Sequence, residues 1–284
     1  KTPVPDVVNR VYQVNQLSFG PDYFIPKPVD PRLITQVSIA VAKAAIKSGV
    51  ARKEITNWGE YRIRLRELMG QETKFTRSLY EAARNDPQRV VFAEGTHPKM
   101  IQAAVLSKEE GICRPILLGN DERIHQLADE LQVSLEGIDI INLRDNAVAP
   151  KRQEYAARLA RMRQREGIND DMARDMMNDR NYFGMMMVET GDADAFITGL
   201  YTKYSNTVKV VKEVIGIRPE FKHFGAMHII NSPKGTYYIA DTMVNENPDT
   251  EALVDLAKLA ATAVRFFNEK PVIGMVSHSN FGSS

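Results

Sequence analysis

The chain has 284 residues, 43% of them hydrophobic and 26% charged, with 37 basic against 36 acidic side chains. This length suffices for one large or two modest domains, and a net charge of +1 excludes the broadly basic surface of a typical nucleic-acid-binding protein. A single cysteine, Cys113, excludes a disulfide scaffold. The N-terminus shows no signal-peptide h-region, and no apolar run approaches the ~20 residues that span a bilayer. We therefore expect a soluble, cytoplasmic globular protein that binds neither nucleic acid nor membranes.

Residues 1–56 are predicted to form an extended strap followed by one helix. Four prolines stand within eleven residues of the strap, which forces an extended backbone. The alanine-rich run 33–47 predicts a helix that begins after Asp30 as N-cap and stops at Gly49. Such a piece is too small to fold alone. Because the chain also opens at Lys1 without a methionine, we expect this piece to pack on a domain upstream.

The next segment, residues 57–87, is predicted to be a helical linker. Apolar residues recur through it at helical spacing, and many of the other positions are arginine. The run Asn85-Asp86-Pro87 ends this pattern, and we place a domain boundary there.

Residues 88–216 are predicted to form a first lobe in which strands and helices alternate. Such alternation, with short apolar strands, is typical of an α/β fold with a parallel sheet covered by helices. A second lobe, 217–284, is predicted to hold two strands around a long helix from 249 to 267, and it looks incomplete. The fold class is thus α/β, with two lobes and mostly parallel sheets. The expected strands cover 89–94, 115–119, 138–141 and 194–198 in the first lobe, and 237–241 and 272–276 in the second.

Several chemistries are excluded because their motifs are missing. The sequence has no G-x-G-x-x-G dinucleotide fingerprint, no Walker A loop and no G-x-S-x-G nucleophile elbow. Its five histidines lack the spacing of metal ligands. The remaining candidates are polar turns after the predicted strands, where open α/β sheets bind their ligands.

Three polar segments are candidates for ligand binding. The turn 94–98 leads into a helix N-terminus and either binds an anion or is an ordinary capped turn. The turn 199–207 is long and rich in hydroxyls, and the segment 277–284 combines hydroxyls with glycine, which suits phosphate or acyl-oxygen contacts. The arginines of 151–166 either recognise phosphate or form a solvated helix face. We expect the methionines of 176–187 in the core rather than on a binding surface.

Longer runs carry a resemblance to known proteins. Residues 17–52, with Phe-Gly-Pro-Asp-Tyr-Phe-Ile-Pro-Lys-Pro and then Val-Ala-Lys-Ala-Ala-Ile-Lys-Ser-Gly-Val-Ala, resemble the C-terminal edge of the malic domain in large bacterial NADP-dependent malic enzymes. Residues 89–284 resemble the phosphate acetyltransferase (phosphotransacetylase) fold that follows that domain in the same enzymes. The matching runs are Arg89–Gly95, Tyr182–Val188, Gly191–Ala195, Ile239–Asn245 and Ser277–Ser284.

The chain also departs from the phosphotransacetylase pattern. One substrate-binding arginine of that family has its match in Arg163, whereas a second is replaced by Lys209, so a planar, bidentate phosphate contact is lost there. The family's Ser-Arg pair and nearby aspartate fall beyond residue 284, so we assign no catalytic residue within the chain. The ligand-binding residues predicted from the turns and the resemblance are Arg163, Lys209, Thr202, Ser205, Asn206, Asp241, Asn245, Ser277, His278, Ser279, Asn280 and Ser283.

The resemblance implies a parent enzyme that oxidatively decarboxylates malate to pyruvate. NADP and Mg²⁺ or Mn²⁺ would bind only in its upstream malic domain, and this chain would have no metal site. The chain would be a regulatory part that binds acetyl-CoA, or another acyl-CoA, and inhibits the malic domain through the 57–87 linker. By the same resemblance it forms homodimers, within larger oligomers of the parent. The alternatives are a working phosphate acetyltransferase, which makes acetyl phosphate from acetyl-CoA and phosphate, and a purely structural oligomerisation module.

Overall fold

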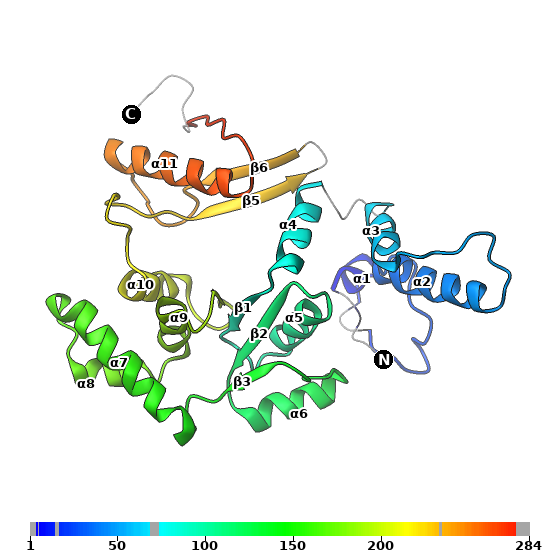
Figure 1. Cartoon of the computed structure of the whole chain (residues 1–284), viewed down its shortest axis with the longest axis horizontal. Coiled ribbons are helices and arrows are strands. Elements are labelled where there is room, and N and C mark those ends of the chain that lie inside the picture. The colour runs from blue at the N-terminus through cyan, green and yellow to red at the C-terminus, as the bar shows by residue number, and fades with distance from the viewer. Residues whose placement is uncertain (1–3, 5, 15–16, 69–73, 233–234, 277–284) are drawn as a thin grey trace. The chain divides into compact units, whose positions relative to one another are not determined.

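The chain forms two compact units, Lys1–Leu200 and Tyr201–Ser284, each with its own sheet (Figure 1). The computed structural model describes residues 4, 6–14, 17–68, 74–232 and 235–276. The second unit begins at Tyr201, whereas the second lobe was predicted to begin at residue 217. Helix α10 (Tyr204–Val214) therefore lies in the second unit. The other predicted domain boundaries stay predictions.

The first unit is built around a parallel four-stranded sheet in the order β3-β2-β1-β4. Its strands and helices alternate along the chain, which confirms the α/β organisation predicted for this region. The strands are β1 (Gln88–Phe92), β2 (Cys113–Leu118), β3 (Asp139–Ile141) and β4 (Ala195–Ile197). The helices between them are α5 (Pro98–Glu109), α6 (Asp121–Leu131), α7 (Ala149–Arg163), α8 (Asp170–Met176) and α9 (Arg180–Thr190), with short 3₁₀ turns at Asn146–Val148 and Gln164–Glu166.

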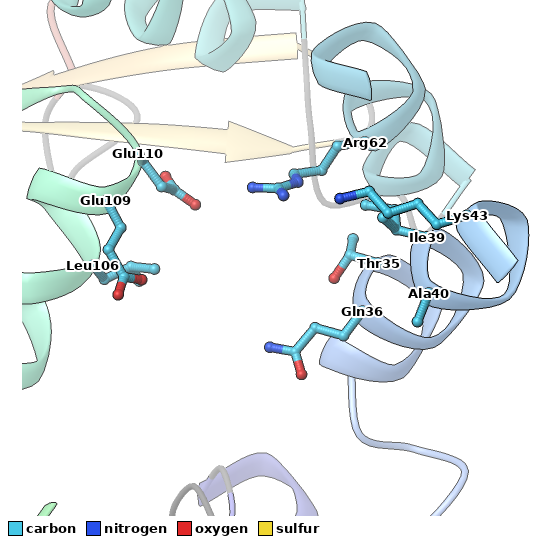
Figure 2. Close-up of a pocket in the computed structure, with 9 residues that line it drawn as sticks. All are labelled: Thr35, Gln36, Ile39, Ala40, Lys43, Arg62, Leu106, Glu109 and Glu110. Carbon is cyan, nitrogen blue, oxygen red and sulfur yellow. The ribbon is translucent and has the colours of Figure 1, made fainter. Parts of the chain in front are cut away.

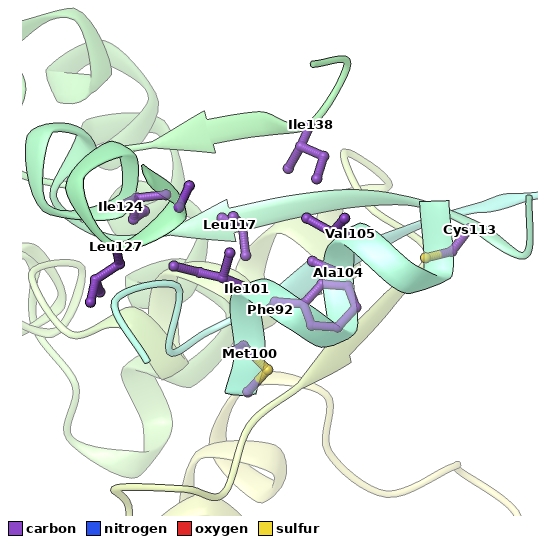
Figure 3. Packing of buried hydrophobic residues seen from close by; sticks show 11 residues of the cluster. Phe92, Met100, Ile101, Ala104, Val105, Cys113, Leu117, Ile124, Leu127 and Ile138 are labelled. Atoms are coloured by element: carbon purple, nitrogen blue, oxygen red, sulfur yellow. The ribbon is translucent and has the colours of Figure 1, made fainter. Parts of the chain in front are cut away.

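One face of the sheet is covered by α5 and α6. Leu117 of β2 and Phe92 of β1 pack in one buried cluster with Ile101 of α5 and Ile124 of α6 (Figure 3). Burying such side chains contributes roughly 1.5–3 kcal/mol each, so this cluster is a main source of stability for the first unit.

The other face of the sheet is covered by α9. Successive strand residues point to opposite faces, so Leu118 points away from the cluster around Leu117. Gly184 of α9 lies so close to the sheet that a Cβ there would be 2.4 Å from the Phe196 ring and 3.2 Å from Leu118. Glycine is therefore what lets α9 approach, and Met185, Met186 and Met187 are buried around it, as predicted for the methionine-rich segment.

The second unit holds a two-stranded sheet and helix α11 (Thr250–Phe266), which contacts strand β6 (Gly235–Ala240). Strand β6 confirms one prediction, but its partner is β5 (Met227–Ser232), which the sequence pattern missed. The sheet is antiparallel rather than parallel, because a connection this short joins only antiparallel strands. Residues 272–276, predicted as a strand, have no ladder partner among the described residues, and Val272 and Val276 are 91% and 98% exposed.

The N-terminal part of the first unit consists of helices and a strap, residues 17–31, that contains no helix. Helices α1 (Asp6–Val11), α2 (Arg32–Lys47), α3 (Trp58–Leu68) and α4 (Lys74–Asn85) follow one another. The segment predicted as a helical linker contains α3 and α4. Asp30 was predicted as the N-cap of α2, but the N-cap is Pro31. The buried Asp30 carboxylate, one position before it, accepts the Arg32 N–H at 3.0 Å. Of the helices described, none is both long and apolar enough to cross a membrane.

An ion pair joins the start of β1 to the start of β4. Asp194 accepts hydrogen bonds from the Arg89 backbone N–H at 2.8 Å and from its guanidinium at 2.8 and 3.0 Å. The Arg89 hydrogen bonds lower the pKa of Asp194 to about 2. Because the folded-state pKa lies below the ordinary value of 3.8, ionised Asp194 stabilises the fold above about pH 4.

We therefore expect Asp194→Asn to unfold at a lower temperature than wild type at pH 7, with a difference that shrinks as the pH falls from about 4 to about 2. Thermal unfolding followed by circular dichroism at several pH values measures this. Asp171→Asn is a matched control, because its carboxylate also pairs with an arginine but is 89% exposed. A difference for Asp194→Asn that is equal at pH 7 and pH 2.5 would contradict the role assigned to the ion pair.

Candidate functional site

The predicted ligand residues fall into separate groups in the structure. Arg163 stands at the end of α7 in the first unit, whereas Thr202, Ser205, Asn206 and Lys209 follow one another on the loop before α10 and on α10 itself. Asp241 and Asn245 lie together after β6. The remaining five, Ser277, His278, Ser279, Asn280 and Ser283, lie outside the described residues.

The N-terminus of α10 lacks a side-chain cap. Several helices are capped by the side chain of their N-cap residue: α5 by His97, α6 by Asn120, α8 by Asn169, α9 by Asp179 and α11 by Asp249. Helices α2 and α7, like α10, have no such cap among the described residues. In α10 the N-cap is Lys203, and its side chain makes no capping bond within the described structure. The first-turn N–H groups and the helix dipole favour an anion at such an end. Ser205 and Asn206, both exposed, place further polar groups in this turn.

Lys209 lies about one turn further along α10. Its side chain is 68% exposed, and its Nζ is 3.7 Å from Oε1 of Glu213, its partner at i+4. This exposure lets Lys209 reach a ligand phosphate, and it equally suits a solvated helix face. The Thr207 hydroxyl oxygen on the same helix is buried and has no hydrogen-bond partner among the described residues, so an atom of a bound ligand or water could satisfy it.

Arg163 is more enclosed than Arg158 of the same helix, whose side chain is 47% exposed. Its side chain is 19% exposed, and Nη1 donates to Glu166 Oε1 at 2.8 Å. Arg152 donates to the Asn178 side chain at 3.2 Å, and Arg158 pairs with Glu189 of α9 at 3.3 Å. Arg152 and Arg158 therefore join α7 to neighbouring segments, which favours the structural interpretation over phosphate recognition for these two.

Asp241 and Asn245 are engaged in holding their own loop. Asp241 accepts the N–H of Ala226 at 2.8 Å and of Asn245 at 2.6 Å, and it also accepts the Asn245 side-chain amide at 2.7 Å. Asn245 donates in addition to the Phe224 carbonyl at 2.9 Å. Burial alone would raise the pKa of Asp241, but these donors outweigh it and hold that pKa below its ordinary value. A ligand role for the two residues stays a prediction.

Of the two interpretations of the turn 94–98, an anion site or an ordinary capped turn, the structure favours the capped turn. His97 Nδ1 accepts the Lys99 N–H at 3.1 Å and so closes the N-terminus of α5. Glu94 is fully buried, and its Oε1 accepts the N–H groups of Gly199 and Leu200. Sequence reasoning gave Glu94 no role of its own. The signal was present, because an acidic residue directly after the apolar run Val-Val-Phe-Ala is a candidate for a buried carboxyl group.

A pocket of about 440 Å³ lies elsewhere in the first unit, lined by residues of α2, α3 and the end of α5 (Figure 2). Lys43 and Arg62 line one side, and Glu109 and Glu110 face them from the other. None of the predicted ligand residues lines it. Among the residues that the structure describes, no three metal-ligating side chains gather anywhere.

Comparison with known proteins decides the family. Residues 74–284 match the family model described as phosphate acetyl/butaryl transferase. The chain belongs to this family. A solved structure of a phosphotransacetylase from Streptococcus pyogenes superposes on 73% of the chain, and on 64% of its own length, with a TM-score of 0.63 and 28% identity. This confirms the predicted phosphotransacetylase-like α/β fold.

Two curated relatives differ in how much of the chain they match. An NADP-dependent malic enzyme of Salmonella typhimurium is 38% identical over 281 residues, which are 98% of this chain and 37% of that enzyme. A phosphate acetyltransferase of Acetivibrio thermocellus is 30% identical over 217 residues, 74% of this chain and 64% of that protein. The chain thus spans little more than a third of the length of the malic enzyme and corresponds to part of it, as the resemblance predicted.

Proposed function

We propose that this chain is the acetyl-CoA-binding regulatory part of an NADP-dependent malic enzyme. One observation carries this proposal: the similarity to the malic enzyme runs through 98% of the chain, whereas the acetyltransferase family model begins only at residue 74. The helices α1 to α3 therefore have counterparts in malic enzymes but lie outside the acetyltransferase match. On this proposal the malic domain, with its NADP and its Mg²⁺ or Mn²⁺, lies upstream. The residues described here do not fit a divalent metal, because no cluster of potential ligands gathers among them.

The surface of the N-terminal part supports such an upstream partner. Phe24 and Ile25 of the strap are 66% and 69% exposed, and Val37 and Val41, one turn apart on α2, are 50% and 61% exposed. Exposed apolar side chains gathered in one segment are typical of a surface that another domain covers. Packing of the malic domain here would join it directly to the α3 and α4 helices that lead to the acetyltransferase fold. Dimerisation through this fold stays a prediction.

The N-terminus of α10, which has no side-chain cap, supports acetyl-CoA as the ligand. Coenzyme A carries several phosphate groups, and the uncapped N–H groups, the nearby Ser205 and Asn206 and the exposed Lys209 are suited to phosphate oxygens. A lysine binds phosphate as a point charge rather than through a planar fork. This is sufficient for holding an effector.

A second candidate function is phosphate acetyltransferase activity, which the family match favours. Phosphate would attack the thioester carbonyl of acetyl-CoA, and hydrogen bonds would stabilise the tetrahedral oxyanion before coenzyme A leaves. By the family resemblance the Ser-Arg pair and the aspartate for this step stand beyond residue 284. The replacement of the second arginine by Lys209 argues against this activity.

Substitution of Lys209 tests the proposed ligand site. We expect Lys209→Ala to weaken acetyl-CoA binding to the 284-residue chain by about 1–3 kcal/mol, since one charge-assisted hydrogen bond is lost. Lys209→Arg should bind within a few-fold of wild type. Isothermal titration calorimetry measures both affinities, and Lys212→Ala, also exposed on α10, is the matched control. An affinity of Lys209→Ala equal to that of wild type would remove Lys209 from the site.

A further inference from the structure

We propose that Glu94 is a positioning residue for the ligand site on α10, because its buried carboxyl group anchors the segment that leads into that helix. The proposal rests on the proposed function for the identity of the ligand. Glu94 is 0% exposed, and its Oε1 accepts the N–H of Gly199 at 3.1 Å and of Leu200 at 3.2 Å. The Thr198 hydroxyl lies 3.1 Å from the same oxygen.

The sheet explains how these residues meet. Strands β1 and β4 are parallel neighbours, with Phe92 opposite Ile197, and the Ala93 N–H donates to the Ile197 carbonyl at 2.9 Å. The two chains therefore leave the carboxyl edge of the sheet side by side, at Glu94 and Thr198. Ligands of open α/β sheets bind at this edge.

The surroundings of Glu94 are built from other buried polar groups. Thr198 Oγ1 also lies 2.9 Å from Oδ1 of Asn181, which is 3% exposed at the start of α9. A buried carboxyl group is costly unless hydrogen bonds compensate it, and glutamate is rarely buried completely. Here two of its donors are backbone N–H groups of one loop. The carboxyl group thus holds the position of that loop.

The anchored loop leads directly to the predicted ligand residues. Gly199 has φ +130°, in a region that glycine adopts readily, and Leu200 and Tyr201 are 47% and 59% exposed. Thr202 follows at once, and α10 begins at Tyr204. An exposed loop of this kind is mobile unless it is anchored. Anchoring removes ordering entropy that acetyl-CoA binding would otherwise have to overcome, so Glu94 raises affinity without touching the ligand.

The variant Glu94→Met tests this proposal. Methionine keeps the side-chain volume but cannot accept the two N–H groups, which can turn to water because Gly199 and Leu200 are exposed. We expect the dissociation constant for acetyl-CoA to rise about 10-fold or more, and amide hydrogen exchange of the 198–203 segment to accelerate about 10-fold. Glu94→Gln, which keeps one acceptor oxygen, should restore both to within about 3-fold of wild type. Glu189→Met, which removes a carboxylate that pairs with Arg158, is the control for general loss of stability.

The outcomes separate the possible failures. Faster exchange in Glu94→Met without loss of affinity overturns the positioning role, and so does a loss of affinity that Glu189→Met reproduces. If Glu94→Met fails to fold, the wild-type chain provides the test. Its Gly199 and Leu200 amides should exchange at least 10-fold more slowly than the same amides in an unstructured chain, and equal rates overturn the anchor. If the wild-type chain does not bind acetyl-CoA, the proposed function is overturned, and so is the effect of Glu94 on affinity. Slow exchange of the Gly199 and Leu200 amides would in that case still establish that Glu94 anchors the loop.

Discussion

Replacing Asp241 by alanine is expected to destabilise the second unit by about 2–4 kcal/mol. The variant leaves the N–H groups of Ala226, Val244 and Asn245 without the carboxylate that accepts them at 2.6–3.3 Å. It also releases the Asn245 side-chain amide from its 2.7 Å bond, so the loop after β6 loses its attachment to the segment before β5. Unfolding in urea, with hydrogen exchange of residues 224–246 as the local readout, measures the loss.

Two variants calibrate this effect. Asp241→Asn keeps one acceptor oxygen and should lose less stability than Asp241→Ala. Glu246→Ala, an exposed position in the same loop, should change the unfolding free energy by less than about 0.5 kcal/mol. If Asp241→Ala unfolds at the urea concentration of wild type and loses acetyl-CoA binding instead, Asp241 contacts the ligand and does not hold the loop.

The first unit was predictable because its pattern is local and repetitive. Each of its central strands is a short apolar run, as in Pro115-Ile-Leu-Leu-Gly119, and each is followed by a helix with a recognisable start. The burial of β2 on both faces produces this continuous apolar run, where a half-buried strand would alternate. The methionine-rich α9 was assigned correctly to the core for a similar reason.

The second unit was less predictable because strand pairing is not local. Strand β5 reads Met-His-Ile-Ile-Asn-Ser, which shows no clear alternation, and it becomes a strand through its hydrogen bonds to β6. Conversely, the run 272–276 has high strand propensity but no strand beside it in the part of the chain that the structure describes. Propensity without a pairing partner does not make a strand.

The candidate site was only partly predictable from the sequence. The polar turn at 199–207 was recognised from its composition, but the sequence could not show that α10 lacks a side-chain cap. It also could not show that Asp241 and Asn245 bond to each other, or that Glu94 meets Leu200 from more than a hundred positions away. These contacts depend on how the strands are ordered in the sheet, and the sequence does not state that order.

Titration of malate oxidation with acetyl-CoA, in the malic enzyme that we propose carries this chain, tests the central claim most directly. We predict that acetyl-CoA inhibits NADP reduction in a saturable way, and that Lys209→Ala and Glu94→Met each shift the inhibition curve to about 10-fold higher acetyl-CoA. The basal rate without acetyl-CoA should stay unchanged in both variants, because on this proposal the malate site lies in another domain. We also predict no acetyl phosphate when acetyl-CoA and phosphate are supplied together. Malate oxidation that is insensitive to acetyl-CoA, together with rapid acetyl phosphate formation, would contradict the regulatory role and establish the acetyltransferase instead.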